Sequence, residues 1–243
     1  MSIWQLFQGE KQFKKIQVTA IRVVEAQHKS TTRKLVDSEM EHEILESMIE
    51  TAKPVFSQED YKKLNYLLWT PFRYPPLKHG SRFGSRYEPS LWYGSLELNT
   101  ALAEVAFYRL RFIRDTKAEL KYCDISLTAF SVPVKTSRGI DLTKKPFQTH
   151  QEKISSKHDY TDSQKLGSDM RHAAVEAFIY FSARTEKFEK NIGIFTPKVF
   201  EHAQPNKEFQ TWRCIANRNG VDFIREDISG KMNVNFSAEY FGF

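Results

Sequence analysis

The first 69 residues show one strand pattern followed by helical patterns. Residues 16–27 (IQVTAIRVVEAQ) are rich in β-branched side chains and predict a β-strand. Residues 38–41 (SEME) resemble a capping box, and the helix that begins there ends before Pro54. Its apolar face consists of Ile44, Leu45, Met48 and Ile49. A weaker box at 57–60 begins a second helix with Tyr61, Leu64, Leu67 and Leu68 on its apolar face.

After Thr70 the periodicity is interrupted by turn-forming residues. Loops are indicated by Pro75, Pro76, Gly80 and Gly84. Residues 91–95 (LWYGS) predict a short strand, and Asn99 or Thr100 begins a helix. The apolar face of that helix consists of Leu102, Val105, Ala106 and Leu110. Glu104 lies beside this stripe, so we expect its carboxylate at the edge of the buried surface.

The second half alternates between short apolar runs and polar segments. Strands are predicted at 122–134, 138–143, 178–181 and 192–195, although 178–181 (FIYF) could also continue the preceding helix. Three aromatic strands are predicted in the tail after Glu208. Residues 144–160 are polar and predict a long loop or broken helix, and residues 164–177 predict a helix. This mixture favours an α+β fold over a doubly wound sheet. We expect residues 1–69 to form a mostly helical N-terminal extension packed on the core, and residues 70–243 to carry the chemistry.

Charge and composition narrow the function classes. The net charge of +6 suggests nucleic acid, but the basic residues are interleaved with acids, as in KAELKYCD, so we expect a solvated surface and no direct nucleic-acid contact. No apolar run approaches the roughly 20 residues of a membrane helix, and the N-terminus lacks the apolar core of a signal peptide. Cys123 and Cys214 lie in no CxxC pattern, which favours a reduced, cytoplasmic setting.

Known catalytic motifs are missing from the sequence. It contains no P-loop and no GxGxxG, which argues against an NTPase or a Rossmann dehydrogenase. No GxSxG surrounds any serine, so a serine hydrolase of that type is poorly supported. No His/Cys/Asp cluster has ligand spacing, so no metal is expected.

Most candidate site residues lie between Thr70 and Arg111. This stretch contains Arg73, Arg82, Arg86, Arg109 and Arg111, together with four tyrosines. Arginine offers a planar fork for phosphate or carboxylate, and a carboxylate such as Glu104 can stabilise a developing cation. Together these residue types predict a pocket for an anionic nucleotide.

The order FRYPP, GSRFGSRY, WYGS, ALAEV and a distant SAR, over residues 70–200, resembles the RES-domain family, named for an Arg, a Glu and a Ser. The resemblance implies a core like that of the ADP-ribosyltransferases. It further implies a toxin of a bacterial toxin–antitoxin pair that degrades NAD⁺ by cleaving the nicotinamide–ribose bond. The implied partner is an antitoxin with an Xre-like helix-turn-helix; a homodimer is left open.

The arginines can be matched to the family pattern in more than one way. Arg73 and Tyr74 in FRYPP are similar to the family's early Arg-Tyr pair. Arg82 is similar to the arginine of its GGRWN-like segment, although Arg86 repeats the same local pattern and Arg22 competes with Arg73 for the first position. The resemblance implies that Arg73 and Arg82 hold the dinucleotide phosphates.

The remaining matches imply the rest of the site. Tyr93 follows the arginine segment, and either this residue or Tyr74 would stack on nicotinamide or close the pocket. Glu104 in ALAEV is similar to the family glutamate and would bond the ribose hydroxyls. Ser182 in YFSAR is similar to the family serine and would hydrogen-bond the nicotinamide ribose or a phosphate. NAD⁺ is thus the implied substrate, with Arg86 as a spare cation.

Two alternatives to NAD⁺ degradation remain open. The same NAD⁺ site could serve mono-ADP-ribosylation of a target protein. A non-catalytic basic module that binds nucleic acid or an acidic partner is the alternative of a different class. Within NAD⁺ degradation, the acceptor is either water or inorganic phosphate, and the sequence does not choose between them.

Overall fold

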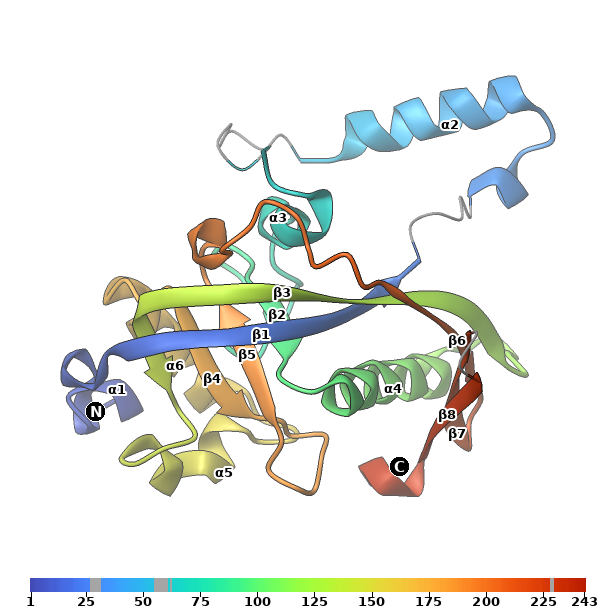
Figure 1. Ribbon diagram of the computed structural model, residues 1–243. Helices are drawn as coiled ribbons and strands as arrows, with labels where there is room; N and C mark the ends of the chain where they lie inside the picture. The colour runs from blue at the N-terminus through green and yellow to red at the C-terminus, as the bar shows by residue number, and fades with distance from the viewer. Residues whose placement is uncertain (27–31, 55–60, 62, 228–229) are drawn as a thin grey trace.

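The computed structural model describes residues 1–26, 32–54, 61, 63–227 and 230–243, built around an eight-stranded mixed sheet (Figure 1). The strand order is β1-β2-β5-β4-β3-β6-β7-β8. The strands are β1 Lys14–Glu25, β2 Trp92–Ser95, β3 Cys123–Asp141, β4 Ala177–Phe181, β5 Lys190–Ile194, β6 Gln210–Ala216, β7 Gly220–Asp227 and β8 Gly230–Ser237. The large mixed sheet with several helices agrees with the predicted mixture of helices and strands.

Five of the strands form a closed ring of pairings. β1 pairs with both β2 and β3, while β2 pairs with β5, β5 with β4, and β4 with β3. All these pairs are antiparallel except β3–β4, which is parallel. The ring brings the ends of β2, β4 and β5 close to one another, and the site described below lies there.

The two strands expected at 122–134 and 138–143 are one strand, β3. Its central residues stay paired with β1 without a break from Leu127 to Thr136, and Gly139 pairs with both β1 and β4. The first part of β3 pairs with β6, which β7 and β8 then extend. A single 19-residue strand therefore joins the ring to the C-terminal strands.

The helices are α1 Ile3–Leu6, α2 Glu39–Ala52, α3 Tyr66–Arg73, α4 Leu98–Asp115, α5 Gln151–Ile154 and α6 Thr161–His172. α4 is the helix predicted from the apolar stripe, and Leu102, Ala106 and Leu110 are buried as expected. It packs on β1, β6 and β7. α6 ends before the predicted 177, because Ala174 has a left-handed φ of 55° and β4 begins at Ala177.

The segment before residue 70 does not behave as a separate extension. β1 is a full member of the central ring, and α1 packs on α6. The backbone groups of β1 are satisfied by pairing with strands of the later segment, so residues before 70 contribute a strand to the sheet. Of the helix expected to carry Tyr61, Leu64, Leu67 and Leu68, only the last two are in α3, which begins at Tyr66 after the Asn65 N-cap and continues to Arg73. The capping box expected at 57–60 lies outside the described residues.

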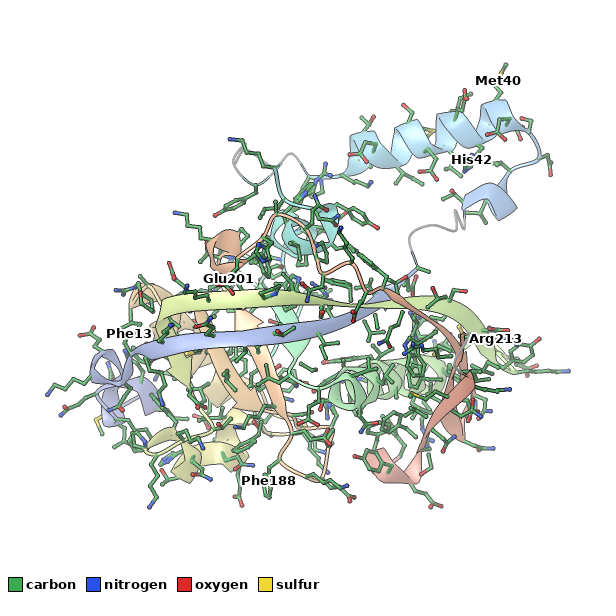
Figure 2. The ribbon with its side chains drawn as sticks, in the orientation of Figure 1. Phe13, Met40, His42, Phe188, Glu201 and Arg213 are labelled. Carbon is green, nitrogen blue, oxygen red and sulfur yellow. The ribbon has the colours of Figure 1, made fainter. Side chains whose placement is uncertain are left out.

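α2 is the helix predicted from the capping box at Ser38, and that box is present. The expected packing of this helix on the core is not observed, since none of its residues is buried. Met40, Ile44 and Met48 are 73%, 54% and 65% exposed. The helix projects away from the sheet, with Met40 on its outer side (Figure 2). On the apolar stripe of α2, Ile44 and Met48 are therefore exposed, whereas Leu45 and Ile49 are partly buried, and the short 3-10 helix η2 (Thr32–Leu35) contacts α2.

Candidate active site

Glu104 and Ser182, which are 78 positions apart in sequence, are in direct contact. Glu104 lies on the edge of α4 and is partly buried, and Ser182 is buried immediately after β4. The Ser182 hydroxyl donates a hydrogen bond of 2.7 Å to Glu104 Oε1. The Asn191 amide of β5 donates a second bond, of 2.6 Å, to the same oxygen.

A chain of hydrogen bonds fixes these groups. Ser95, at the end of β2, donates to Asn191 Oδ1 at 2.7 Å, which orients the Asn191 amide toward Glu104. Ser182 Oγ accepts from the backbone N–H of Arg184 at 3.0 Å, which points its hydroxyl hydrogen toward Glu104. Two neutral donors thus hold Glu104 Oε1, while Oε2 makes no hydrogen bond with the described residues and is available to a ligand.

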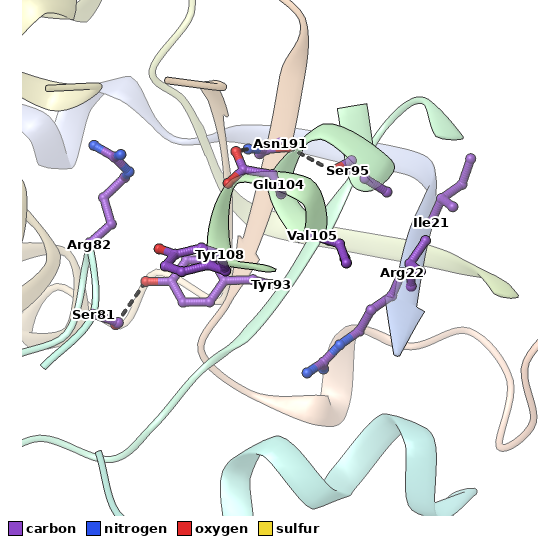
Figure 3. Close-up of a pocket in the computed structure, with 13 residues that line it drawn as sticks. Ile21, Arg22, Ser81, Arg82, Tyr93, Ser95, Glu104, Val105, Tyr108 and Asn191 are labelled. Atoms are coloured by element: carbon purple, nitrogen blue, oxygen red, sulfur yellow. Dashed lines mark hydrogen bonds between the residues drawn. The ribbon is translucent and has the colours of Figure 1, made fainter. Parts of the chain in front are cut away.

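Tyr93 supports the turn that carries Arg82. Its hydroxyl is 2.9 Å from Ser81 Oγ (Figure 3) and accepts a 3.0 Å bond from the backbone N–H of Phe83. Burial raises the pKa of Tyr93 to about 12, so the phenol is neutral at physiological pH. Tyr93, predicted to stack on nicotinamide or close the pocket, therefore contacts the 81–83 turn and also lines the pocket.

Arg82 is fixed by the segment before α6. Its Nη1 donates to the carbonyl of Ser156 at 2.6 Å, and its guanidinium lies 4.5 Å from the ring centroid of Tyr160. Because a planar guanidinium offers five N–H donors, these contacts leave others for a ligand. Arg82 is thus a pre-positioned cation beside the pocket.

Arg22, the competitor for the first arginine position, also lines the pocket. It projects from β1, and its guanidinium lies 5.2 Å from the ring centroid of Trp92. Its Nη1 is buried and has no hydrogen-bond partner among the described residues. Burial lowers the pKa of Arg22 to about 10, and no acidic group offsets that effect. The residue as a whole is only partly buried, but a buried donor such as Nη1 is costly in free energy unless a ligand supplies an acceptor.

These side chains surround a cavity of about 210 Å³. Figure 3 shows Arg82 to one side of Glu104 and Arg22 to the other. The cavity is lined by Ile21, Arg22, Val23, Ser81, Arg82, Tyr93, Gly94, Ser95, Ala101, Glu104, Val105, Tyr108 and Asn191. It therefore combines one carboxylate, two guanidiniums and two tyrosines.

Four of the predicted site residues do not line this cavity: Ser182, which contacts it only through its hydrogen bond to Glu104, and Arg73, Tyr74 and Arg86. Arg73, at the end of α3, donates to the carbonyl of Pro54 at 2.7 Å and pairs with Glu50 of α2 at 3.3 Å. Tyr74 follows it and is 39% exposed. Arg86 is exposed, with its guanidinium over the ring of Tyr87. The structure thus brings together Glu104, Ser182, Arg82 and Tyr93, and places Arg22 rather than Arg73 beside them.

Sequence reasoning missed Asn191, Ser95 and Tyr108. Asn191 is 1% exposed in β5, where a buried amide must find polar partners. In the sequence it follows Lys190 at the end of the polar segment 182–191, so nothing local distinguishes it from a loop residue. Tyr108 is 54% exposed as a residue, but desolvation of its hydroxyl is the main cause of a raised pKa, and the nearby hydroxyl of Tyr160 and carboxylate of Glu104 add to it.

The described residues contain no group of three His, Cys, Asp or Glu side chains that could hold a metal ion. In the same residues, no helix combines the length and the apolar character that crossing a bilayer requires.

Comparison with known proteins identifies a family. The sequence model of the family described as RES domain matches residues 58–216. A similar solved structure is the crystal structure of the M. tuberculosis MbcT–MbcA toxin–antitoxin complex, with a TM-score of 0.46 and 8% sequence identity; the alignment covers 98% of this chain and 93% of that chain. No curated protein matches the chain.

Proposed function

This chain belongs to the RES-domain family, and from that premise we propose that it is a toxin that degrades NAD⁺ by cleaving the nicotinamide–ribose bond. The observation that carries the proposal is the Glu104 carboxylate, held through one oxygen by Ser182 and Asn191 in a cavity that also contains two arginines. A fixed carboxylate with one free oxygen can bond sugar hydroxyls and stabilise positive charge.

The reaction needs charge stabilisation more than proton transfer. The bond between the anomeric carbon and the nicotinamide ring nitrogen breaks, and both electrons leave with nicotinamide, which departs as a neutral molecule. The ribose passes through an oxocarbenium-like transition state, as in glycoside hydrolysis. We assign Glu104 Oε2 to the ribose and its developing cation. Ser182 and Asn191 hold the carboxylate in place for that role.

Substrate binding falls to the cations and aromatic rings. Arg82 and Arg22 would bind the phosphates by charge-assisted hydrogen bonds, and Tyr108 and Tyr93 would border the nicotinamide ribose. At about 210 Å³, the cavity is smaller than the roughly 300–1,000 Å³ of typical ligand pockets. We therefore propose that the nicotinamide ribose end enters it and that the adenosine end lies outside.

The partner proposed is an antitoxin protein with an Xre-like helix-turn-helix that covers the cavity. This proposal is supported by membership in the RES-domain family and by the motif order over residues 70–200 that resembles that family. An ADP-ribosyltransferase-like core and a cytoplasmic site of action, where NAD⁺ is available, belong to the same proposal.

Product analysis tests the activity. Purified protein is incubated with NAD⁺ in buffers with and without inorganic phosphate, and the products are separated by chromatography. We expect nicotinamide together with ADP-ribose, or with its phosphorylated form if phosphate is the acceptor. Label transferred to protein would instead establish mono-ADP-ribosylation. Intact NAD⁺ in every buffer, with folded protein, would contradict the proposal.

Growth of expressing cells tests the toxin assignment. Wild type produced without a partner should arrest growth, and Glu104→Gln at equal soluble level should be tolerated. Glu97→Gln, which alters an exposed carboxylate just before α4, is the matched control and should arrest growth like wild type. Equal growth with wild type and Glu104→Gln would count against a toxin that works through this site.

A further inference from the structure

A second cavity, of about 290 Å³, lies beside the chain that follows Ser182. The 183–186 segment forms one wall, and Phe107 of α4, Lys157, and Tyr240 and Phe241 near the C-terminus complete it. It shares no lining residue with the Glu104 cavity. None of the roles assigned above uses it.

Two adjacent residues present unsatisfied polar atoms in its wall. Arg184 Nε and Thr185 Oγ1 are both buried, and neither has a hydrogen-bond partner within the described part of the chain. Buried polar atoms without partners are rare in native proteins, and an unoccupied ligand or ion site is one of their causes. Nε–H can only donate and the threonine hydroxyl can donate as well, so a ligand with acceptor oxygens would satisfy both atoms.

Arg184 is held rigidly and is not a loose surface side chain. It is 5% exposed, and its guanidinium carbon lies 3.4 Å from the ring centroid of Phe107. Its Nη1 donates to the carbonyl of Lys157 at 3.2 Å, and its Nη2 donates to the hydroxyl of Tyr160 at 3.0 Å. Two nitrogens are thus satisfied by neutral oxygens, and no carboxylate of the described residues is bonded to this buried cation.

The charges around the cavity favour an anion. Arg184 and the exposed Lys157 supply two positive charges, against one carboxylate, that of the exposed Glu186. We propose that this cavity binds a phosphate group, through Arg184 Nε and the Thr185 hydroxyl, with Lys157 adding electrostatic attraction. Arginine forks and hydroxyl donors are common partners of phosphate oxygens.

The cavity is connected to the Glu104 site through shared contacts. Ser182 Oγ accepts from the Arg184 backbone N–H and donates to Glu104. Tyr160 accepts from Arg184 and stacks with Arg82, which lines the Glu104 cavity. A phosphate bound at Arg184 would therefore lie against the groups that orient the candidate catalytic carboxylate. The binding inference itself does not rest on NAD⁺ cleavage.

Direct binding of inorganic phosphate tests the inference. Titration of the full chain by calorimetry, in a buffer free of phosphate and NAD⁺, should show saturable binding. Thr185→Val removes the hydroxyl at nearly constant volume, and Lys157→Gln removes a lining charge; each should weaken binding by about tenfold. Lys187→Gln makes the same charge change at a residue that does not line the cavity and should bind like wild type. Glu186→Gln, which removes the opposing charge, should bind more tightly.

The source of the phosphate group is found by adding ADP-ribose. If ADP-ribose displaces phosphate from wild type, and Thr185→Val weakens the binding of both phosphate and ADP-ribose, the cavity binds a phosphate group of the nucleotide. If phosphate still binds in the presence of ADP-ribose, the cavity binds the free anion. No binding by folded wild type would overturn the inference, and so would equal affinity in wild type, Thr185→Val and Lys157→Gln, because attraction would then come from the surface in general. Both outcomes are independent of whether the protein consumes NAD⁺.

Discussion

At the scale of single residues, the candidate site depends on polar groups buried among apolar ones. Glu104 and Ser182 were identifiable in the sequence because they belong to a motif order, and the structure places them 2.7 Å apart. Asn191 was not, because it stands at the end of the polar segment 182–191, directly after Lys190, where an amide looks like an ordinary loop residue. Choosing between Arg22 and Arg73 required the fold, since only strand pairing shows that β1 lies beside β2.

The arginine assignment gives the first prediction. Arg22→Met removes a guanidinium that has no acidic partner, and its side chain can still pack on Trp92. We expect NAD⁺ consumption to fall by about two orders of magnitude. The free energy of unfolding should rise by roughly 1–3 kcal/mol, because the substitution removes Nη1, a buried donor without a partner among the described residues.

Arg73→Met is the comparison for that variant. Arg73 pairs with Glu50 and stacks with Trp69, away from the cavity lining, so activity should be kept. Urea unfolding and an NAD⁺ assay measure both quantities. Full activity in Arg22→Met together with its loss in Arg73→Met would return the role to Arg73.

The second prediction concerns Asn191. Asn191→Asp is nearly isosteric, but it replaces the donor that is 2.6 Å from Glu104 with a second carboxylate. Two carboxylates at this distance share a proton, which raises the folded-state pKa of the pair above its unfolded value. Stability of the variant should therefore be closest to wild type in acid and should fall as the pH rises through that pKa.

The expected loss at neutral pH is about 3 kcal/mol. Urea unfolding of wild type and Asn191→Asp measures the difference in their free energies of unfolding. The measurements run from about pH 4 to about pH 8, because a raised carboxyl pKa lies in that range. A difference that does not change with pH would show that the two side chains do not interact as described.

At the scale of elements, periodicity predicted the pieces and long-range pairing decided how they join. α4, β2, β4, β5 and the three C-terminal strands were predictable from local pattern. The union of two predicted strands into β3 was not, because it depends on pairing with β1 some 110 positions earlier in the chain. The exposure of α2 was also unpredictable, since an apolar stripe does not reveal whether it is covered.

Close contact between α6 and the Arg82 turn gives the third prediction. A Cβ atom at Gly167 would lie 2.1 Å from the carbonyl oxygen of Phe83, which is backbone and cannot rotate away. Gly167→Ala must therefore displace the 81–84 turn. We expect a stability loss of about 1–3 kcal/mol and reduced activity, whereas Lys165→Ala on the exposed side of α6 should change neither. Wild-type stability in Gly167→Ala, measured by urea unfolding, would contradict this packing.

The exposed stripe of α2 gives the fourth prediction. Ile44→Gln and Met48→Gln alter side chains that are 54% and 65% exposed. Each should change the free energy of unfolding by less than about 0.5 kcal/mol. Leu102→Ala, at a position 1% exposed in α4, is the buried comparison and should lose about 2–5 kcal/mol. Losses above about 1 kcal/mol in the α2 variants would mean that the stripe is covered in solution.

At the scale of the whole molecule, the ring of strands explains how residues from distant segments reach one cavity. β1 supplies Arg22, β2 supplies Tyr93 and Ser95, and β5 supplies Asn191. α4 packs beside the ring and presents Glu104 to them. The long β3 links this ring to the C-terminal strands. The 3-10 helix that follows β8, Glu239–Phe241, contributes Tyr240 and Phe241 to the second cavity. Family membership was predictable from motif order, whereas the cavity itself depends on the closure of the ring.

The rate of NAD⁺ consumption by purified wild type and Glu104→Gln, with Glu97→Gln as the matched control, tests the central proposal most directly. Glutamine keeps the size of the side chain but removes the charge that would stabilise the oxocarbenium ion. We predict that wild type and Glu97→Gln consume NAD⁺ at similar rates, and that Glu104→Gln is slower by about two to three orders of magnitude while remaining folded. Equal rates in wild type and Glu104→Gln, or no consumption by folded wild type, would contradict the assignment of Glu104 as the catalytic carboxylate of an NAD⁺-degrading toxin.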